Sequence, residues 1–424
     1  MRPDATGTAF DAVENSAFDA VSGDIFDRAI DRRLSGSLKW NGRGMARDGR
    51  EILPLWVADM DFAAPPAVAA AVAARAAHPI YGYAAATEGM FEAFALWMKS
   101  RHGVDVEREW LVFAPGVVPA LAFSLRAFSS PGQGVAFASP AYQPFFNLTT
   151  RNARKVEASP LRLDSGGRYR MDLEDLGRRL GPETPLMLLC SPHNPTGRVW
   201  EPGELEDLAS LAADKGTIVV SDEIHSDLVL GSARHVPALA LGGRAGERLR
   251  SRLVSLYAPS KTFNIAGLQA SFAVIPDPGL RASFVAEMEG AGIELPNVFA
   301  ARAAEVAYRE GGPWLAALLD YLRGNRELLG SFIAERLPAL SACPTEGTYL
   351  AWIDFRRSGL PGVEARGALH RFLTEEAALW LSEGCQYGPG GEGFARLNFG
   401  CPRAVLRDAL ERLEAALGRG SAGA

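Results

Sequence analysis

Residues 186–197 read LMLLCSPHNPTG, and residues 217–225 (TIVVSDEIH) and 253–264 (LVSLYAPSKTFN) follow the same plan. Each stretch opens with a short apolar run, which is typical of a buried strand, and ends in polar residues that stop the strand. Helical patterns lie between several such runs, and one of them, at 204–215, is followed by Gly216 as a C-terminal cap. Strands that alternate with helices predict a mostly parallel sheet that is covered on both faces.

This α/β pattern extends from about Trp110 to Pro276 and changes after residue 310. The C-terminal part predicts a second, smaller α+β domain, with a long helix after Gly312, a helix around 365–383 and a last helix that stops at Gly418. Strands are expected at Tyr349–Phe355 and Phe394–Phe399. The predicted division is a flexible N-terminal extension (1–24), a segment that joins the small domain (25–70), a large domain (71–310) and a small C-terminal domain (311–424).

Composition excludes several classes of protein. The chain has 424 residues, of which 48% are hydrophobic and 22% are charged, as in ordinary soluble globular proteins, and its net charge is −6. No run of Lys and Arg predicts nucleic-acid binding, no apolar stretch predicts a membrane span, and the N-terminus has no secretory signal pattern. The four cysteines form no C-x-x-C pair, so we expect reduced thiols, a cytoplasmic location and no metal site.

Polar or aromatic residues follow the predicted strands at their carboxyl ends, where open α/β sheets bind ligands. In chain order they are Val117 and Val118 at the start of a helix after Gly116, then Tyr142, Asn194, Asp222 and Lys261. Each residue alone has an ordinary reading as a turn, a helix cap, a packing residue or a solvated loop residue. Together, free N–H groups for an anion, an aromatic ring, an amide, a carboxylate and a lysine suit a phosphorylated pyridine aldehyde.

These motifs resemble a known family. The chain is similar to the fold-type I pyridoxal-phosphate (PLP) enzymes of the aminotransferase class I/II superfamily, and within it to the MalY/PatB branch of cystathionine β-lyases, or C–S lyases. The matching segments are Ser191–Gly197, Asp222–His225, Ser260–Leu268, Leu55–Phe62, Tyr81–Tyr83, Glu346–Leu350 and Arg396–Arg403. The likeness runs from about Phe26 to Leu417. It implies the PLP transferase fold and PLP as the cofactor of the large domain.

The resemblance also implies residue roles around the cofactor ring. Lys261 would carry PLP as a Schiff base and then act as the base at the substrate Cα, because burial and a cationic neighbour lower the pKa of a lysine. Asp222 would pair with the pyridine nitrogen, and Asn194 would donate to the 3′-oxygen. Tyr142 would stack on the ring. His225 is expected either beside the same oxygen or as part of the supporting scaffold.

Phosphate and substrate contacts follow from the same resemblance. The N–H groups of Val117 and Val118, with Ser260, would bind the phosphate, although Ala258 stands where some relatives have a hydroxyl residue, which leaves that ligand set open. Tyr83 would reach the phosphate of the partner subunit, which implies a homodimer with shared active sites and places Tyr83 with Lys261 among the catalytic residues. Arg396, with Asn194, would bind the substrate carboxylate. Candidates for recognition of the thiol part of the substrate are Trp56, Tyr81 and Tyr349.

The residues expected to bind the cofactor do not determine which PLP-dependent reaction takes place. Resemblance to the C–S lyases implies α,β-elimination of a cysteine S-conjugate, such as a cystathionine-like substrate, to a thiol, pyruvate and ammonia. An aminotransferase or a decarboxylating deaminase, for example in natural-product or antibiotic biosynthesis, is the first alternative. A regulatory binding protein is the second, because one member of the branch also represses a transcription activator by contact.

Overall fold

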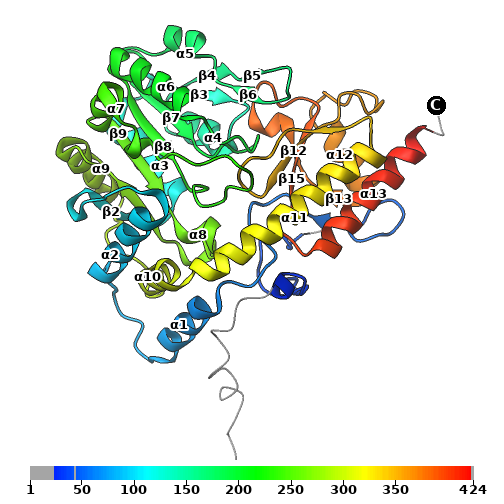
Figure 1. Cartoon of the computed structure of the whole chain (residues 1–424), viewed down its shortest axis with the longest axis horizontal. Helices are drawn as coiled ribbons and strands as arrows, with labels where there is room; N and C mark the ends of the chain where they lie inside the picture. The colour runs from blue at the N-terminus through cyan, green and yellow to red at the C-terminus, as the bar shows by residue number, and fades with distance from the viewer. Residues whose placement is uncertain (1–22, 43, 422–424) are drawn as a thin grey trace, which may run out of the picture.

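A seven-stranded sheet forms the centre of the larger part of the chain. The computed structural model describes residues 23–42 and 44–421 (Figure 1). The strand order is β2-β10-β9-β8-β7-β3-β4, and only β10 runs antiparallel to its neighbours. The strands are β2 (Leu111–Ala114), β3 (Gly134–Ser139), β4 (Lys155–Pro160), β7 (Leu186–Cys190), β8 (Ile218–Asp222), β9 (Leu253–Tyr257) and β10 (Ser271–Val274). The mostly parallel sheet is therefore confirmed.

Helices cover both faces of this sheet, which explains why its strands are continuous apolar runs. Successive residues of β8 illustrate this, because Val219 packs into one hydrophobic cluster and Val220 into the other. The first face carries α2 (Glu88–Trp97), α5 (Leu173–Arg179), α6 (Pro202–Lys215), α7 (Gly243–Arg250) and α10 (Ala300–Glu310). The second carries α3 (Val117–Phe128), α4 (Gln143–Arg151) and α9 (Pro278–Gly290). We call this sheet with its helices the large half.

A four-stranded antiparallel sheet forms the small half, in the order β11-β12-β15-β14. Its strands are β11 (Ser341–Ala342), β12 (Leu350–Asp354), β14 (Ser382–Glu383) and β15 (Phe394–Asn398), and its helices are α11 (Gly312–Arg336), α12 (Ala368–Glu375) and α13 (Arg403–Ser421). The long helix α11 runs from the large half along the small one (Figure 1).

Two helix predictions are wrong in their limits. The helix expected around 365–383 covers only Ala368–Glu375, because residues 379–380 instead form β13, which pairs in parallel with β1 (Leu53–Pro54). Tertiary pairing with a distant segment overrides the local helical pattern there. The last helix continues through Gly418 to Ser421, because this glycine does not take the left-handed conformation of a cap.

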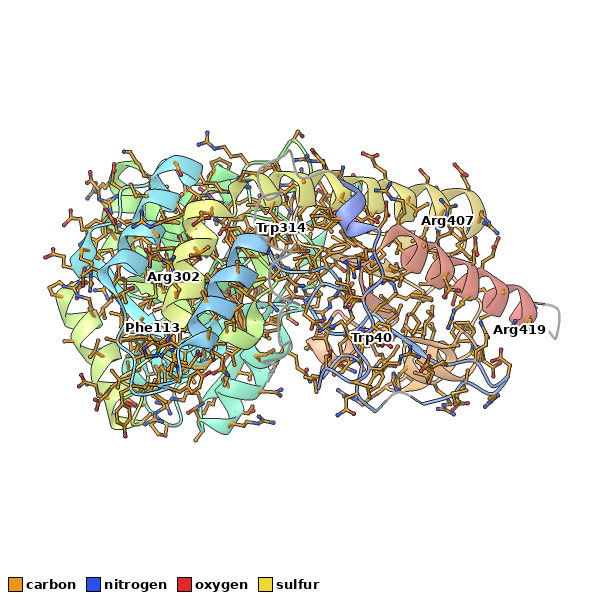
Figure 2. The ribbon with its side chains drawn as sticks, turned by 90° about the horizontal axis from the view of Figure 1, so that it is seen from below. Trp40, Phe113, Arg302, Trp314, Arg407 and Arg419 are labelled. Carbon is orange, nitrogen blue, oxygen red and sulfur yellow. The ribbon has the colours of Figure 1, made fainter. Side chains whose placement is uncertain are left out.

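Part of the N-terminal segment pairs with the small half through β1 and β13, and α1 (Pro66–Ala77) packs against α10 of the large half. Figure 2 shows Trp40 in the half that holds α13, Phe113 in the large half, and Trp314 where α11 passes between them. Phe26 packs edge-on against Trp314, with ring centroids 5.6 Å apart. The division into domains stays a prediction, and most of the expected extension, residues 1–22, lies outside the described residues. None of the described helices is long and apolar enough to cross a bilayer.

Candidate functional site

Three of the predicted site residues lie at the ends of neighbouring parallel strands or directly after them. In the sheet, Cys190 of β7 lies opposite Asp222 of β8, and Asp222 lies opposite Leu256 of β9. Because these strands end at one edge, the chain segments that follow them carry Asn194, Asp222 and Lys261 into the same region. These three residues of the large half span 67 positions of the sequence, from 194 to 261, and the structure brings them to the same edge of the sheet.

Lys261 lies in the short helix α8 (Pro259–Thr262), directly after β9. Its amine donates a hydrogen bond to the carbonyl oxygen of Ala58, at 2.5 Å. Burial lowers the pKa of Lys261 to about 8, while the carboxylates of Asp59 and Asp222 act in the opposite direction. With this pKa, about a tenth of the amine is unprotonated at pH 7, far more than for an ordinary lysine, and the unprotonated form is the one that acts as a nucleophile or a base.

Asp222 is a buried carboxyl group, with 2% of its surface exposed. Burial raises the pKa of Asp222 to about 7, although the N–H of Ile224 (3.2 Å from Oδ1) and the charge of Lys261 favour the ionised form. No ion pair with Asp222 is found within residues 23–42 and 44–421. A buried carboxylate without a bonded cation is costly, so this position suits a cationic group supplied by a ligand.

Replacement of Asp222 should change the pH dependence of the apoenzyme's stability. The folded protein keeps this proton up to about pH 7, whereas an unfolded Asp releases it near pH 4, so the wild-type free energy of unfolding falls as pH rises between these values. Asp222→Asn has no carboxyl group at this position, so its free energy of unfolding does not fall for this reason. We expect its free energy of unfolding, relative to wild type, to increase by about 2 kcal/mol from about pH 5 to about pH 8 in urea titrations. A difference that stays constant with pH would contradict the assigned burial of the carboxylate.

Arg396 reaches this region from β15 in the small half. Its guanidinium donates from Nη1 to Asn194 Oδ1 (3.0 Å) and from Nη2 to the carbonyl oxygen of Trp56 (2.6 Å). Its Nε is buried and has no hydrogen-bond partner among the described residues. The guanidinium is thus held at a fixed place across the two halves, and an incoming carboxylate can use donors that the chain leaves free.

Tyr142 and His225 complete the group on the side of the large half. Burial is the main cause that raises the pKa of Tyr142; the charge of Asp222 raises this pKa further, and the charge of Arg396 lowers it. The phenol therefore lies within electrostatic range of both charges. Burial lowers the pKa of His225 well below its usual value, and the charges of Lys261 and Arg396 add to this effect. The buried Nδ1 of His225 has no partner in the described part of the chain. His225 is therefore a neutral imidazole with a free nitrogen, within electrostatic range of the lysine.

The start of α3 offers backbone N–H groups, as the sequence predicted. The helix begins at Val117 after Gly116, whose φ of 136° strongly favours glycine, and no side chain caps it. The N–H of Gly116 itself donates to Ser271 Oγ (3.1 Å), so the next N–H groups, of Val117 and Val118, form the uncapped end. Such an end attracts an anion. Ser260 adjoins Lys261 in α8.

Two predicted residues are placed differently from the rest. Tyr83 has 99% of its surface exposed, so its ring is not packed against the site of its own chain. The ring of Trp56 stacks on Trp380, with centroids 4.9 Å apart, and only its carbonyl oxygen contacts Arg396. For substrate binding, Trp56 therefore supplies a backbone acceptor that orients the arginine. No sequence pattern identifies a contact made by a carbonyl oxygen.

Sequence reasoning assigned no role to Asp59, although it lies inside the quoted segment 55–62. Its carboxylate forms an ion pair with Arg32 (2.6 Å), while its buried Oδ1 has no hydrogen-bond partner among the described residues. The charge of Asp59 favours the protonated form of Lys261. The neighbouring carbonyl, of Ala58, accepts from both Lys261 and Tyr349 Oη (2.8 Å). Two acidic residues within three positions, Asp59 and Asp61, were the signal that could have directed attention here.

Comparison with known proteins gives the family. The model of the family "Aminotransferase class I and II" matches residues 50–413. The chain belongs to this family. Within the aminotransferase class I and II family, it is 42% identical to "Cystathionine beta-lyase PatB" of Bacillus subtilis (strain 168), over 92% of this chain and 99% of the relative. It is 33% identical to "Protein MalY" of Escherichia coli (strain K12), over 92% of this chain and 97% of that protein.

A solved structure of this family agrees in fold. The PLP-bound C-S lyase from Staphylococcus hominis matches with a TM-score of 0.84 and 30% identity, and the match covers 92% of this chain and 97% of that one. The PLP transferase fold and the likeness to the MalY/PatB branch, which the motifs indicated, are confirmed.

Proposed function

We propose that the crevice around Lys261 binds PLP. The observation that carries this proposal is a lysine with a lowered pKa in electrostatic range of a buried Asp222 that forms no ion pair within the described chain. Lys261 would hold the cofactor covalently, Asp222 its ring nitrogen, and Asn194 and His225 its ring oxygen. Tyr142 would cover the ring, while the phosphate would take the N–H groups of Val117 and Val118 with Ser260. When bound, PLP supplies an electron sink for bond cleavage at an amino-acid Cα.

The protein is proposed to be a C–S β-lyase. Relatives named cystathionine β-lyase and C-S lyase support this reaction, in which a cysteine S-conjugate and water yield a thiol, pyruvate and ammonia. Arg396 binds the substrate carboxylate and so fixes the orientation of Cα. Lys261, with its pKa of about 8, takes the Cα proton as an unprotonated amine and can return a proton to the leaving sulfur.

A keto-acid-free assay tests this reaction. The holoenzyme is incubated with cystathionine or an S-alkyl cysteine, and thiol and pyruvate are measured without any added keto acid. We expect both products at equal rates. Turnover that requires an added keto acid would identify an aminotransferase, and carbon dioxide release without thiol would identify a decarboxylating deaminase. Both outcomes would overturn the lyase proposal while leaving PLP binding intact.

The exposed Tyr83 supports a homodimer with shared active sites. It lies on residues 78–87, between α1 and α2, where Ile80 and Tyr81 are also exposed, with 68% and 57% of their surfaces accessible. Exposed large apolar side chains gathered in one segment are typical of an interface. We infer that Tyr83 completes the phosphate site of the partner subunit.

Mixed dimers test the position of Tyr83. Lys261→Ala and Tyr83→Ala should each be nearly inactive as homodimers. When the two variants are unfolded, mixed and refolded together, half of the dimers combine one chain of each kind and contain one intact site. We expect about a quarter of wild-type activity in the mixture, because the symmetric dimer has two sites. Activity that stays at the level of the separate variants would show that Tyr83 acts within its own chain.

We propose a cytoplasmic location from the state of the thiols. Cys190, Cys343, Cys385 and Cys401 are all unpaired, as is usual for proteins that fold in a reducing compartment.

A further inference from the structure

The helix that carries Lys261 is too short to fix its own orientation. Helix α8 (Pro259–Thr262) has four residues, and no side chain of the described residues caps its start. A helix of one turn is marginal by itself, because its nucleation costs more free energy than its few hydrogen bonds recover. The orientation of Lys261 therefore depends on the contacts that the neighbouring side chains make with other parts of the chain.

Two side chains anchor this helix. Asn264 accepts from the N–H of Met60 (3.0 Å) and donates to the carbonyl oxygens of Met60 (3.0 Å) and Phe62 (2.7 Å). Thr262 donates from its hydroxyl to Asp227 Oδ2 (2.8 Å). One anchor thus binds backbone of the N-terminal segment, whereas the other binds a carboxylate of the large half.

The carboxylate of Asp227 is held in place by three side chains besides Thr262. Its Oδ1 accepts from Trp97 Nε1 (3.1 Å), lies 3.0 Å from His102 Nε2 and pairs with Arg101 Nε (2.8 Å). Burial alone would raise the pKa of Asp227, but its contacts with His102 and Arg101 lower this pKa. The carboxylate is therefore ionised, and a hydrogen bond to an ionised acceptor is stronger than one between neutral groups.

The segment that carries Asp227 also carries Asp222. The two residues are five positions apart, and the turn between them is closed by the N–H of Ser226, which donates to the carbonyl oxygen of Glu223 (3.0 Å). One short segment therefore connects the carboxylate expected at the cofactor ring nitrogen with the carboxylate that anchors the helix of Lys261.

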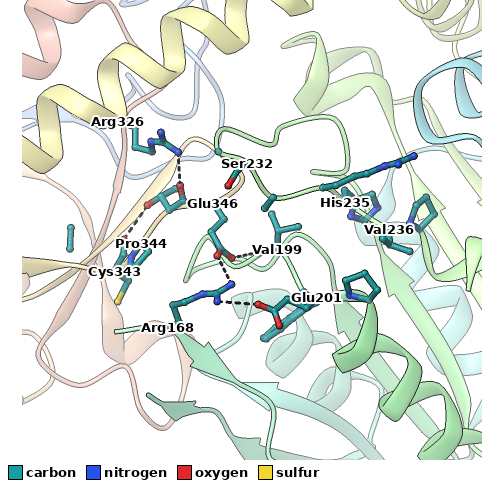
Figure 3. A pocket seen from close by; sticks show the side chains of 18 of the residues that line it. Arg168, Val199, Glu201, Ser232, His235, Val236, Arg326, Cys343, Pro344 and Glu346 are labelled. Atoms are coloured by element: carbon teal, nitrogen blue, oxygen red, sulfur yellow. Dashed lines mark hydrogen bonds and ion pairs between the residues drawn. The ribbon is translucent and has the colours of Figure 1, made fainter. Parts of the chain in front are cut away.

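The bond between Thr262 and Asp227 is shielded from solvent. On the other side of the carboxylate, His102 lines a cavity of about 1040 Å³, and Figure 3 shows this cavity with His235 in its lining. The rings of His102 and His235 lie edge to face, with centroids 5.7 Å apart. Thr262 is 1% exposed and does not line the cavity. Without its hydroxyl, Asp227 Oδ2 would keep only the longer contact from Trp97 (3.3 Å) among the described residues.

We propose that Thr262 and Asp227 are positioning residues, which hold Lys261 in place for proton transfer at the substrate Cα. Asp227 fixes the hydroxyl of Thr262, and this hydroxyl fixes the helix from which the amine reaches the crevice. The inference rests on the proposed function, in which Lys261 is the base. Because Asn264 remains as the second anchor, loss of the hydroxyl should displace the amine without unfolding the helix. Such a displacement lowers kcat, while substrate binding through Arg396 is unchanged.

Exchange of the Cα hydrogen of L-alanine with heavy water tests this role in the holoenzyme. L-Alanine has no leaving group at Cβ, so the exchange reports proton transfer whichever product the enzyme forms. Thr262→Val removes the hydroxyl at nearly constant volume, and we expect kcat for exchange to fall roughly tenfold with KM unchanged. Thr262→Ser keeps the donor and should exchange about as fast as wild type. Rates are normalised to the borohydride adduct on Lys261, so that inactive protein does not contribute.

Thr149→Val provides the matched control. Thr149 is also buried, and its hydroxyl donates to the carbonyl oxygen of Phe145 (2.7 Å) within α4. The control therefore loses a buried hydroxyl and one hydrogen bond, as Thr262→Val does, but without a contact to α8. We expect its exchange of L-alanine to match wild type.

Backbone hydrogen exchange of the holoenzymes, followed by mass spectrometry, reports the order of the helix independently of activity. In α8 the N–H of Phe263 donates to the carbonyl oxygen of Pro259 (2.9 Å). Amides of the peptide that contains α8 should exchange about fivefold faster in Thr262→Val than in wild type, as expected for one lost hydrogen bond. The same peptide should be unchanged in Thr149→Val.

Several results would overturn the positioning role. They are an unchanged kcat in Thr262→Val, a Thr262→Ser variant as slow as Thr262→Val, a Thr149→Val variant that is equally slow, or α8 amides that exchange alike in all variants. A wild type that forms the adduct but exchanges no Cα hydrogen would refute Lys261 as the base, and the positioning role with it. Failure of the proposed function is thus visible in the wild type, whereas failure of this inference is visible only in the variants.

Discussion

Lys261→Ala should lose thiol release almost completely, with kcat lower by roughly four orders of magnitude, since the variant lacks both the covalent anchor and the base. Borohydride treatment of the wild-type holoenzyme should attach the cofactor covalently, and mass spectrometry of the digest should find it on the peptide that contains Lys261. The variant should show no such adduct. The physical basis is the combination of burial, which lowers the pKa of this lysine to about 8, with its position beside Asp222.

Two control variants separate chemistry from folding in this experiment. Lys99→Ala removes an exposed lysine that pairs with Asp105 (2.6 Å), and it should keep both the adduct and the rate. Lys261→Arg keeps a positive charge beside Asp59 and Asp222 and should fold normally, but it forms no adduct. A borohydride adduct on any other lysine of the wild type, or full activity in Lys261→Ala, would refute the assignment of the cofactor lysine.

The large half could be predicted from sequence because its signals are local. Runs such as 186–190 and 253–257 are buried on both faces, so nearly every residue is apolar, Ser255 being the exception, and the strands are easily recognised. The polar residues at their ends, including Asp222, must then gather at one edge of a parallel sheet. Strand β4 (Lys155–Pro160) was not predicted, because an edge strand with exposed ends lacks a continuous apolar run.

The small half and the rim of the site depend on contacts between distant segments. The pairing of residues 53–54 with 379–380 makes α12 shorter than the helix expected around 365–383, and no sequence pattern in either stretch predicts this pairing. Arg396 was placed in the site by family resemblance alone. Its orientation comes from Asn194, 202 positions earlier, and from the carbonyl oxygen of Trp56. Secondary-structure propensity and hydrophobic periodicity contain no information on such contacts. The contacts depend on the path that the chain takes through the fold.

Arg396→Ala should reduce kcat/KM for a cysteine S-conjugate by roughly a hundredfold, mainly through KM, because two charge-assisted hydrogen bonds to the carboxylate are lost. Arg396→Lys should show an intermediate loss of about tenfold, since an ammonium cannot reproduce the planar pair of donors. Arg356→Ala, at an exposed pair with Asp354 (2.6 Å) in the same small half, serves as the control and should match wild type.

A substrate without a carboxylate separates binding from structural damage in Arg396→Ala. Removal of the guanidinium leaves Asn194 Oδ1 without a donor and leaves the Trp56 carbonyl with Ser382 Oγ (3.0 Å) alone, so part of any loss of activity could come from a disturbed site. An S-alkyl cysteamine has the same thioether but no carboxylate, and wild type should process it slowly. If Arg396 acts by binding the carboxylate, the variant should process this amine as fast as wild type does, and the two changes together should cost no more than either alone. A variant that is a hundredfold slower on the amine as well would show that Arg396 positions the site and does not bind the substrate carboxylate.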